Sequence, residues 1–263
     1  FAIADLSVSS TSTSSTTLSW RAPGDDGGSQ QPEYVIVISV DGMGSSYVTP
    51  LLAAGDNQMV NFIRFMDEGA GTMNARDDAG YAITLPNHIT MMTSRGVAGE
   101  TGHGWSANTT PAADATIAAN KGSYVASAFD VAHDNGLRTG IWAGKTKFNL
   151  FQQSYGAATG AVDATGEDNG QDKIDYDKVT NGITAANLAT DFLAQMASDP
   201  FNFAFVHFQD PDATGHASGW STDPDSAFAA TLKAVDTQIG NILDAIEANS
   251  TLNGKTTVIL TAD

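Results

Sequence analysis

The sequence predicts an α/β fold, in which a mostly parallel central sheet carries helices on both faces. Four continuous apolar runs rich in β-branched and aromatic residues are spaced along the chain, which is typical of strands buried on both sides. Helical patterns lie between these runs, and strands that alternate with helices form parallel sheets. With 263 residues, 41% of them hydrophobic, the chain is long enough to bury a large core.

The predicted elements follow one another in a regular order. Strands are expected over residues 34–40 (YVIVISV), 136–144, 201–208 and 256–263. Helices are expected over 46–69, after Pro86, over 123–135, over 183–197 and over 224–248. The stretch 152–182 is rich in Gly, Asp, Asn and Ala, and this composition predicts a long surface excursion.

Residues 1–32 have a different character from the rest of the chain. Residues 5–20 (DLSVSSTSTSSTTLSW) are rich in Ser and Thr and alternate with apolar positions, which predicts short strands. Residues 21–31 (RAPGDDGGSQQ) predict a turn or linker. The segment resembles the first two strands of a fibronectin type III module but is too short to close a sandwich. We therefore expect a fibronectin-III-like remnant or a Ser/Thr-rich linker, followed by one catalytic core over 33–263.

The charge balance limits the possible partners. Thirty acidic and 12 basic side chains give a formal charge of −18, which argues against binding to nucleic-acid duplexes or anionic membranes. A small phosphate-bearing substrate remains compatible, because bound metal ions would invert the local charge. There is no cysteine, so disulfides, thiolate metal sites and a cysteine nucleophile are excluded. No apolar run reaches the roughly 18 residues needed for a membrane span.

Metal-binding side chains follow the predicted strands. Asp41 ends the first strand and Asp263 the last. Asp212 and His216, four residues apart after the third strand, have a spacing that suits one zinc ion, although Asp210 competes with Asp212 for this role. Because parallel strands end at one edge of a sheet, sites gather there. The alternatives are a helix N-cap for Asp41 and a surface position for His216.

Two further segments carry candidate groups for phosphoryl chemistry. Thr84 precedes the helix that Pro86 is expected to begin, and a helix N-terminus favours anions. A hydroxyl held there is a candidate nucleophile if a metal ion lowers its pKa; otherwise Thr84 is an ordinary cap. Lys145 and Lys147 follow the second strand and either face a substrate phosphate or are solvated surface lysines.

Six segments in this order resemble the alkaline phosphatase superfamily, in its type I phosphodiesterase/nucleotide pyrophosphatase branch. They are VIVISVDGMG (35–44), ITLPNHITMMTSR (83–95), GHGWSAN (102–108), FDVAHDNGLRTGIWAGKTKF (129–148), FVHFQDPDATGHASGW (205–220) and VILTAD (258–263). The combination of T-L-P-N-H with P-D-x-x-G-H is specific, and the matching segments cover most of residues 33–263. The resemblance implies an alkaline-phosphatase-like core and a hydrolase that cleaves phosphodiester or pyrophosphate bonds.

The resemblance also implies the roles of individual residues. Two divalent metal ions, usually Zn²⁺, are bound, and Thr84 is the nucleophile that forms a phospho-threonine intermediate. One ion is held by Asp41, Thr84 and Asp263 and the other by Asp212 and His216, while Asn108 donates to a phosphoryl oxygen. A dinuclear clamp of this kind requires Asp41 to lie within about 10 Å of Asp212. The implied substrate is a small phosphate ester, for example a nucleotide.

The sequence departs from the family pattern at its end. The family continues D-H-G after the last strand, whereas this sequence stops at Asp263. We therefore expect a C-terminally truncated core, with weak metal binding and little turnover, and an active full-length parent. The alternatives are a phosphomonoesterase of the same superfamily and a catalytically incomplete extracellular module. A sulfatase and a phosphoglycerate mutase fit less well. By resemblance, we expect an extracellular or periplasmic location.

Overall fold

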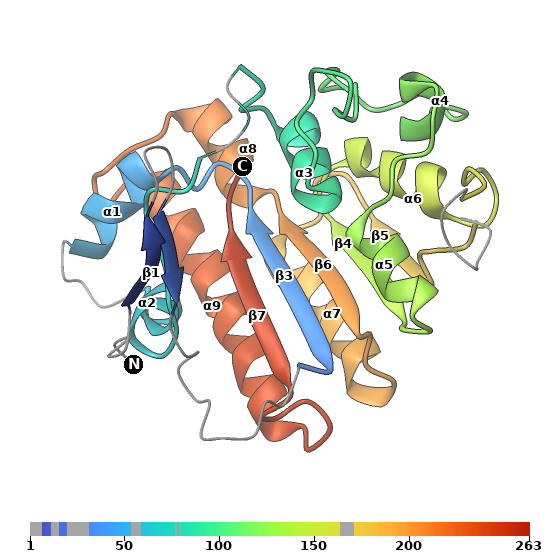
Figure 1. Ribbon diagram of the computed structural model, residues 1–263. Coiled ribbons are helices and arrows are strands. Elements are labelled where there is room, and N and C mark those ends of the chain that lie inside the picture. Colours follow the sequence, from blue (N-terminus) through green and yellow to red (C-terminus); the bar gives the residue numbers. More distant parts are fainter. Residues whose placement is uncertain are drawn as a thin grey trace.

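The computed structural model describes residues 7–11, 16–19, 32–53, 59–76, 78, 80–163 and 171–263. Its centre is a five-stranded sheet in the order β5-β4-β6-β3-β7 (Figure 1). The strands are β3 (Tyr34–Val40), β4 (Thr139–Ala143), β5 (Tyr176–Val179), β6 (Phe203–Phe208) and β7 (Thr256–Thr261). All four pairings are parallel, which confirms the predicted α/β fold.

The strand register brings the carboxyl ends of the central strands together. Ser39 of β3 lies opposite His207 of β6 and Thr261 of β7. His207 is in turn opposite Ala143 of β4. The residues that follow these strands therefore share one edge of the sheet, where sites form in parallel sheets.

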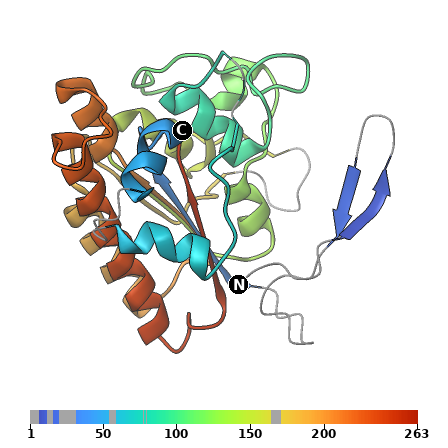
Figure 2. The ribbon, with the colours of Figure 1, turned by 90° about the vertical axis from the view of Figure 1, so that its left-hand side faces the viewer.

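Helices cover both faces of the sheet, as Figure 2 shows. One core cluster joins the sheet to α1, α2, α7 and α9, and a second joins it to α3, α5, η1 and α6. The helices are α1 (Ser45–Ala53), α2 (Val60–Asp67), α3 (Thr84–Thr93), α4 (Ile117–Lys121), α5 (Ala128–Asp134), η1 (Thr146–Phe148), α6 (Asn149–Tyr155), α7 (Ala185–Ser198), α8 (Asp210–Ser218) and α9 (Ala227–Ala248). The chain thus forms three layers around a sheet that is buried at its centre.

Two sequence predictions are wrong in detail. The single helix predicted over 46–69 is two helices, α1 and α2, and residues 54–58 lie outside the described ranges. The excursion predicted over 152–182 instead contains the end of α6 and the edge strand β5. The β5 sequence YDKV is short and only partly buried, so it lacks the apolar run that marked the other strands.

The N-terminal segment contains β1 (Ser7–Thr11) and β2 (Thr16–Ser19), which pair as an antiparallel two-stranded sheet. Short strands were expected there from the alternating apolar positions. The turn or linker predicted over 21–31 lies outside the described residues. Whether residues 1–32 are a fibronectin-III-like remnant or a linker stays a prediction.

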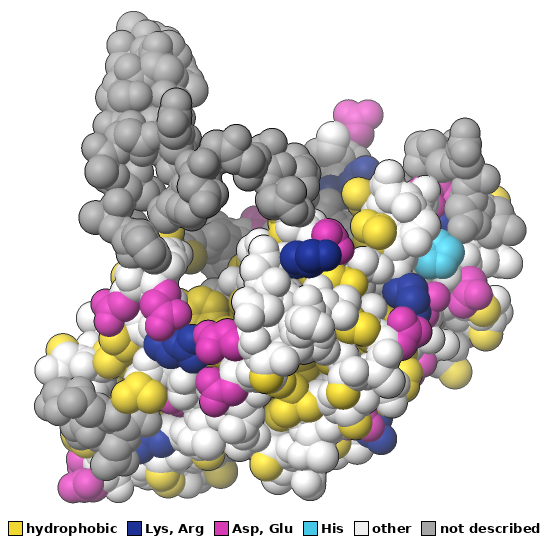
Figure 3. All heavy atoms as spheres, turned by 90° about the horizontal axis from the view of Figure 1, so that it is seen from below, with side chains coloured by type: hydrophobic (Ala, Val, Ile, Leu, Met, Phe, Trp, Pro, Cys, Tyr) yellow, Lys and Arg dark blue, Asp and Glu magenta, His cyan; other side chains and the backbone are white. Residues whose placement is uncertain are grey.

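The surface carries charges of both signs. On the face opposite the strand carboxyl ends, acidic, basic and hydrophobic side chains are intermixed (Figure 3). None of the helices among the described residues is long and apolar enough to cross a membrane.

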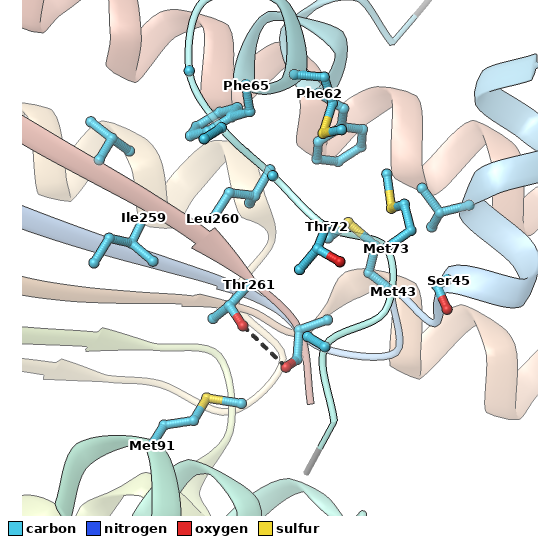
Figure 4. A pocket seen from close by; sticks show the side chains of 18 of the residues that line it. Met43, Ser45, Phe62, Phe65, Thr72, Met73, Met91, Ile259, Leu260 and Thr261 are labelled. Atoms are coloured by element: carbon cyan, nitrogen blue, oxygen red, sulfur yellow. Dashed lines mark hydrogen bonds between the residues drawn. The ribbon is translucent and has the colours of Figure 1, made fainter. Parts of the chain in front are cut away.

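At the sheet edge formed by β7, a groove of about 1270 Å³ lies between this strand, α2 and the segment around Met73 (Figure 4). The groove also contacts Asp263, so it opens beside the strand ends described next.

Candidate active site

The ammonium group of Lys145 is the point at which the predicted site residues meet. Lys145 follows β4, and its Nζ lies 2.5 Å from Asp41 Oδ2 and 2.7 Å from Asp212 Oδ2. The same nitrogen lies 3.4 Å from Thr84 Oγ1. Asp41 and Asp212 therefore both contact one nitrogen, well inside the limit of about 10 Å that a dinuclear clamp requires. Four chain segments far apart in sequence therefore converge here.

Asp41 is fully buried directly after β3. Its Oδ2 accepts a hydrogen bond from His207 Nε2 at 2.9 Å, whereas its Oδ1 is buried without a hydrogen-bond partner. Burial opposes ionisation of this carboxyl, but His207 and Lys145 outweigh it and hold the pKa of Asp41 below its ordinary value. Asp41 is therefore a buried carboxylate with one oxygen still available.

Asp263 lies beside Asp41 at the end of β7. Its Oδ1 accepts a hydrogen bond from the Gly42 backbone N–H at 2.9 Å. Burial and the neighbouring Asp41 carboxylate raise the pKa of Asp263 to about 7. The positive charge near Asp41 and Asp263 is therefore not enough to stabilise both carboxyls in the ionised form.

Gly42 allows the first and third strand ends to approach closely. Its φ of 77° is in the left-handed region, and an added Cβ would lie 2.8 Å from Asp212 Cα. A glycine is therefore required here on two counts. The Asp-Gly pair after β3 has a packing role as well as a possible ligand role.

Thr84 is the first residue of α3, whereas the sequence prediction placed it just before the helix. Its side chain lies at the helix N-terminus, where unpaired N–H groups favour negative charge. Its carbonyl oxygen accepts a hydrogen bond from His88 Nδ1 at 2.6 Å, so the other ring nitrogen of His88 accepts from Ser39 Oγ at 2.7 Å. Burial, assisted by His207, lowers the pKa of His88 to about 3 and keeps the ring neutral.

Asn108 connects the start of α3 to the second lysine. Its Oδ1 accepts hydrogen bonds from Leu85 N and from Lys147 Nζ, each at 2.9 Å. Because the carbonyl oxygen is engaged, the amide nitrogen of Asn108 remains as a donor near the start of α3. Burial, with a contribution from Lys145, lowers the pKa of Lys147. Both lysines are partly buried and contact predicted site residues, and their role towards a substrate phosphate stays a prediction.

The structure separates the two competing aspartates after β6. Asp212 faces Lys145, and its Oδ1 lies 3.3 Å from His216 Nε2. Asp210 instead accepts a hydrogen bond from the Ala185 backbone N–H at the start of α7, and burial raises its pKa. The His216 side chain is 72% exposed and lies beside Trp220. Of the two aspartates, Asp212 is therefore better placed than Asp210 to be a metal ligand.

Sequence reasoning missed His88 and His207. Both are fully buried, and their rings lie 5.1 Å apart between Thr84 and Asp41. His88 lies within the quoted T-L-P-N-H segment and His207 near the end of a predicted buried strand, so a signal for each was present. A histidine at such a position usually packs in the core with its hydrogen bonds satisfied. Only the hydrogen bond to Asp41 distinguishes His207 from such a core residue.

The donor set fits divalent cations. Within the described ranges, no three His, Asp or Glu side chains already surround one point. The candidate ligands form two pairs, Asp41 with Asp263 and Asp212 with His216. Hard or borderline cations bind such carboxylate and imidazole groups. Burial beside the Asp41 carboxylate raises the pKa of Asp263, which indicates a lack of positive charge near these two carboxyls that a cation would relieve.

The sequence model of the family described as type I phosphodiesterase/nucleotide pyrophosphatase matches residues 35–263. The chain belongs to this family. Bis(5'-adenosyl)-triphosphatase enpp4 of Xenopus laevis is 26% identical over 246 residues, which are 91% of this chain and 48% of that protein. The chain thus spans about half the length of this curated relative.

Solved structures share the fold. Murine ectonucleotide pyrophosphatase/phosphodiesterase 5, as an inactive threonine-to-alanine variant in complex with AMP, aligns with a TM-score of 0.60 and 20% identity, over 89% of this chain and 56% of that one. An alkaline phosphatase superfamily protein from Vibrio parahaemolyticus aligns with a TM-score of 0.55 and 13% identity, over 88% and 54%. These likenesses confirm the alkaline-phosphatase-like core.

Proposed function

We propose that the protein is a metal-dependent hydrolase of phosphodiester or pyrophosphate bonds that acts through Thr84. The observation that carries this proposal is the convergence of Asp41, Asp212 and Thr84 on one cation, Lys145 Nζ, at the strand carboxyl ends. Membership of the phosphodiesterase family supports the reaction class. The inactivity of the threonine-to-alanine variant of murine ectonucleotide pyrophosphatase/phosphodiesterase 5 supports a threonine nucleophile.

Two divalent metal ions, with zinc as the expected metal, would be held by the two ligand pairs. Asp41, Asp263 and the Thr84 hydroxyl would hold one ion, and Asp212 with His216 would hold the other. When bound, such ions lower the pKa of a coordinated hydroxyl and neutralise charge on the attacking and leaving oxygens. A measurement of bound metal also tests the alternative of a catalytically incomplete module, which would bind none.

The residues of the chain position and neutralise the phosphoryl group. Thr84 Oγ1, having lost its proton, would attack phosphorus in line while the bond to the opposite ester oxygen breaks and the leaving alcohol or phosphate takes up a proton from water. A water molecule would then cleave the phospho-threonine, which releases the phosphate product and returns the Thr84 hydroxyl. The Asn108 amide nitrogen would donate to a non-bridging oxygen, the positive end of the α3 dipole would favour its charge, and Lys147 lies beside Asn108. Phosphoryl transfer depends mainly on such positioning and electrostatic stabilisation.

The test is hydrolysis of bis(p-nitrophenyl) phosphate by zinc-loaded protein. We expect zinc-dependent turnover, slow for the 263-residue chain, that Thr84→Ala reduces to the rate of the protein-free reaction. Thr84→Ser retains a hydroxyl and keeps part of the activity. Thr190→Ala, an exposed position on α7, is the matched control and leaves the rate unchanged. Equal turnover by wild type and Thr84→Ala would exclude Thr84 as the nucleophile.

A second candidate function, phosphomonoester hydrolysis, is favoured by the two lysines. A monoester dianion carries more charge on its non-bridging oxygens than a diester, and Lys145 and Lys147 add two cations next to Thr84 and Asn108. The ratio of kcat/KM for p-nitrophenyl phosphate and bis(p-nitrophenyl) phosphate decides between them. A monoester preference that Lys147→Met removes would establish the second candidate.

The substrate is proposed to be a small phosphate ester such as a nucleotide. The relatives named above are a bis(5'-adenosyl)-triphosphatase and a protein solved with AMP. Competition of AMP and of bis(5'-adenosyl) triphosphate with the chromogenic diester tests this proposal directly. The extracellular or periplasmic location stays a prediction.

A further inference from the structure

The Lys145 ammonium makes the contacts that a metal cation would make at this site. Its Nζ bridges Asp41 Oδ2 at 2.5 Å and Asp212 Oδ2 at 2.7 Å, one oxygen from each proposed ligand pair. Its third contact, at 3.4 Å, is the proposed nucleophile, Thr84 Oγ1. One ammonium therefore holds together groups from three separate chain segments.

We propose that the Lys145 ammonium is an internal cation that holds the carboxylates of the site together in the metal-free protein and that metal ions displace. This inference rests on the proposed function, because it concerns the same carboxylates. Asp41 Oδ2 already carries Lys145 and His207, so a metal ion that binds this oxygen exchanges with the ammonium.

The lysine is the partner that can move in this exchange. Lys145 precedes η1 and carries a long flexible side chain that is 13% exposed, so it has a route towards solvent. Asp41, by contrast, is fixed at the end of a central strand and fully buried. The movable partner of the pair is therefore the lysine. After displacement, the ammonium is released from the two carboxylates and is more accessible to solvent.

The proposal predicts opposite effects of one substitution on metal affinity and on metal-free stability. Lys145→Met removes the competing charge and keeps the length of the side chain. On metal binding, the wild type loses the charge-assisted hydrogen bonds of Lys145, whereas the variant has none to lose. The variant should therefore bind zinc about 10- to 100-fold more tightly. In the metal-free protein, the same variant leaves Asp41 and Asp212 without their shared cation, so its melting temperature should fall.

Isothermal titration with zinc and thermal melting in EDTA test both effects. Lys147→Met is the matched control, because it removes an equal charge from the same segment but contacts Asn108 rather than the carboxylates. We expect the control to shift the zinc Kd by no more than about threefold, as for a screened charge at longer range. Equal zinc affinity in wild type and Lys145→Met would overturn the inference and leave the proposed function standing. Failure of every variant and of wild type to bind zinc would overturn both.

A measurement on wild type keeps the test valid if Lys145→Met does not fold. Lysine acetylation followed by peptide mass spectrometry reports how accessible each ammonium is. We expect acetylation of Lys145 to rise when zinc is added, while acetylation of Lys255, whose side chain is 42% exposed, stays constant. Unchanged or lower acetylation of Lys145 on zinc binding would show that the ammonium is not displaced.

Discussion

His103 offers a sharp test of how the loop that carries Asn108 is held. The ring is fully buried, and its Nδ1 accepts a hydrogen bond from the Trp105 backbone N–H at 3.1 Å. Its Nε2 therefore carries the proton and donates to Thr90 Oγ1 on α3 at 3.1 Å. Protonation of Nδ1 would remove the acceptor for Trp105, and burial lowers the pKa of His103 to about 4.

The sign of the pH effect follows from the unfolded state. Unfolded histidine has a pKa of about 6.5 and binds its proton first as the pH falls, so the free energy of unfolding decreases between pH 6.5 and 4. The difference between these two pKa values corresponds to about 3 kcal/mol. Burial raises the pKa of Asp130 to about 7, so this residue changes the pH dependence of stability in the opposite direction. The total free energy of unfolding therefore does not show the contribution of His103 alone.

A comparison of wild type with His103→Asn isolates the contribution of His103 to the pH dependence of stability. Urea unfolding followed by tryptophan fluorescence gives the free energy of unfolding from pH 7.5 to 4.5. At pH 7.5 we expect wild type to be more stable by about 2 kcal/mol, because the variant loses a buried hydrogen bond and ring contacts. At pH 4.5 this advantage should vanish or reverse. Thr90→Val, which keeps the imidazole, should retain the steep wild-type dependence. A constant difference between wild type and His103→Asn would refute the buried neutral histidine.

Three further predictions concern the fold and the site. Asp236→Ala removes the acceptor for the first N–H groups of α2 and should lower the free energy of unfolding by about 2–4 kcal/mol in urea, whereas the exposed Asp244→Ala should change it by less than about 0.5 kcal/mol. Gly42→Ala should weaken zinc binding at least about tenfold in calorimetry, because its Cβ would displace Asp212; an unchanged affinity contradicts that close approach. Asn108→Ala should lower kcat/KM for bis(p-nitrophenyl) phosphate about 100-fold without changing the zinc affinity, and a loss of zinc binding would point to a structural role instead.

The parallel sheet explains why so much of the site was predictable. Asp41, Asp212 and Asp263 each follow an apolar run, and parallel strands end at one edge, so their proximity follows from the fold class. The helix start near Thr84 followed from Pro86. The assignment of specific roles depended on the family resemblance, because strand ends alone allow caps as well as ligands.

What the sequence left open depends on tertiary contacts. Two lysines after a strand are equally consistent with solvent and with a site, and only the approach of Asp41 and Asp212 places Lys145. The position of His207 near the end of an apolar strand was a signal, but it did not distinguish a site residue from a histidine packed in the core. The strand β5 escaped detection because its pairing with β4, rather than its own composition, makes it a strand.

The charge arrangement is compatible with the proposed anionic substrate in a protein of formal charge −18. The Asp41 and Asp212 carboxylates share the Lys145 ammonium, and Asp263 lies beside Asp41. The Thr84 hydroxyl lies near the same ammonium, and Lys147 contacts Asn108. A small phosphate ester at this site would therefore meet cationic groups although the protein as a whole is acidic, because short-range contacts outweigh surface charge that salt screens beyond about 10 Å. Net charge thus limits which large polyanions the protein would bind, whereas the local arrangement would decide whether a small one binds at this site.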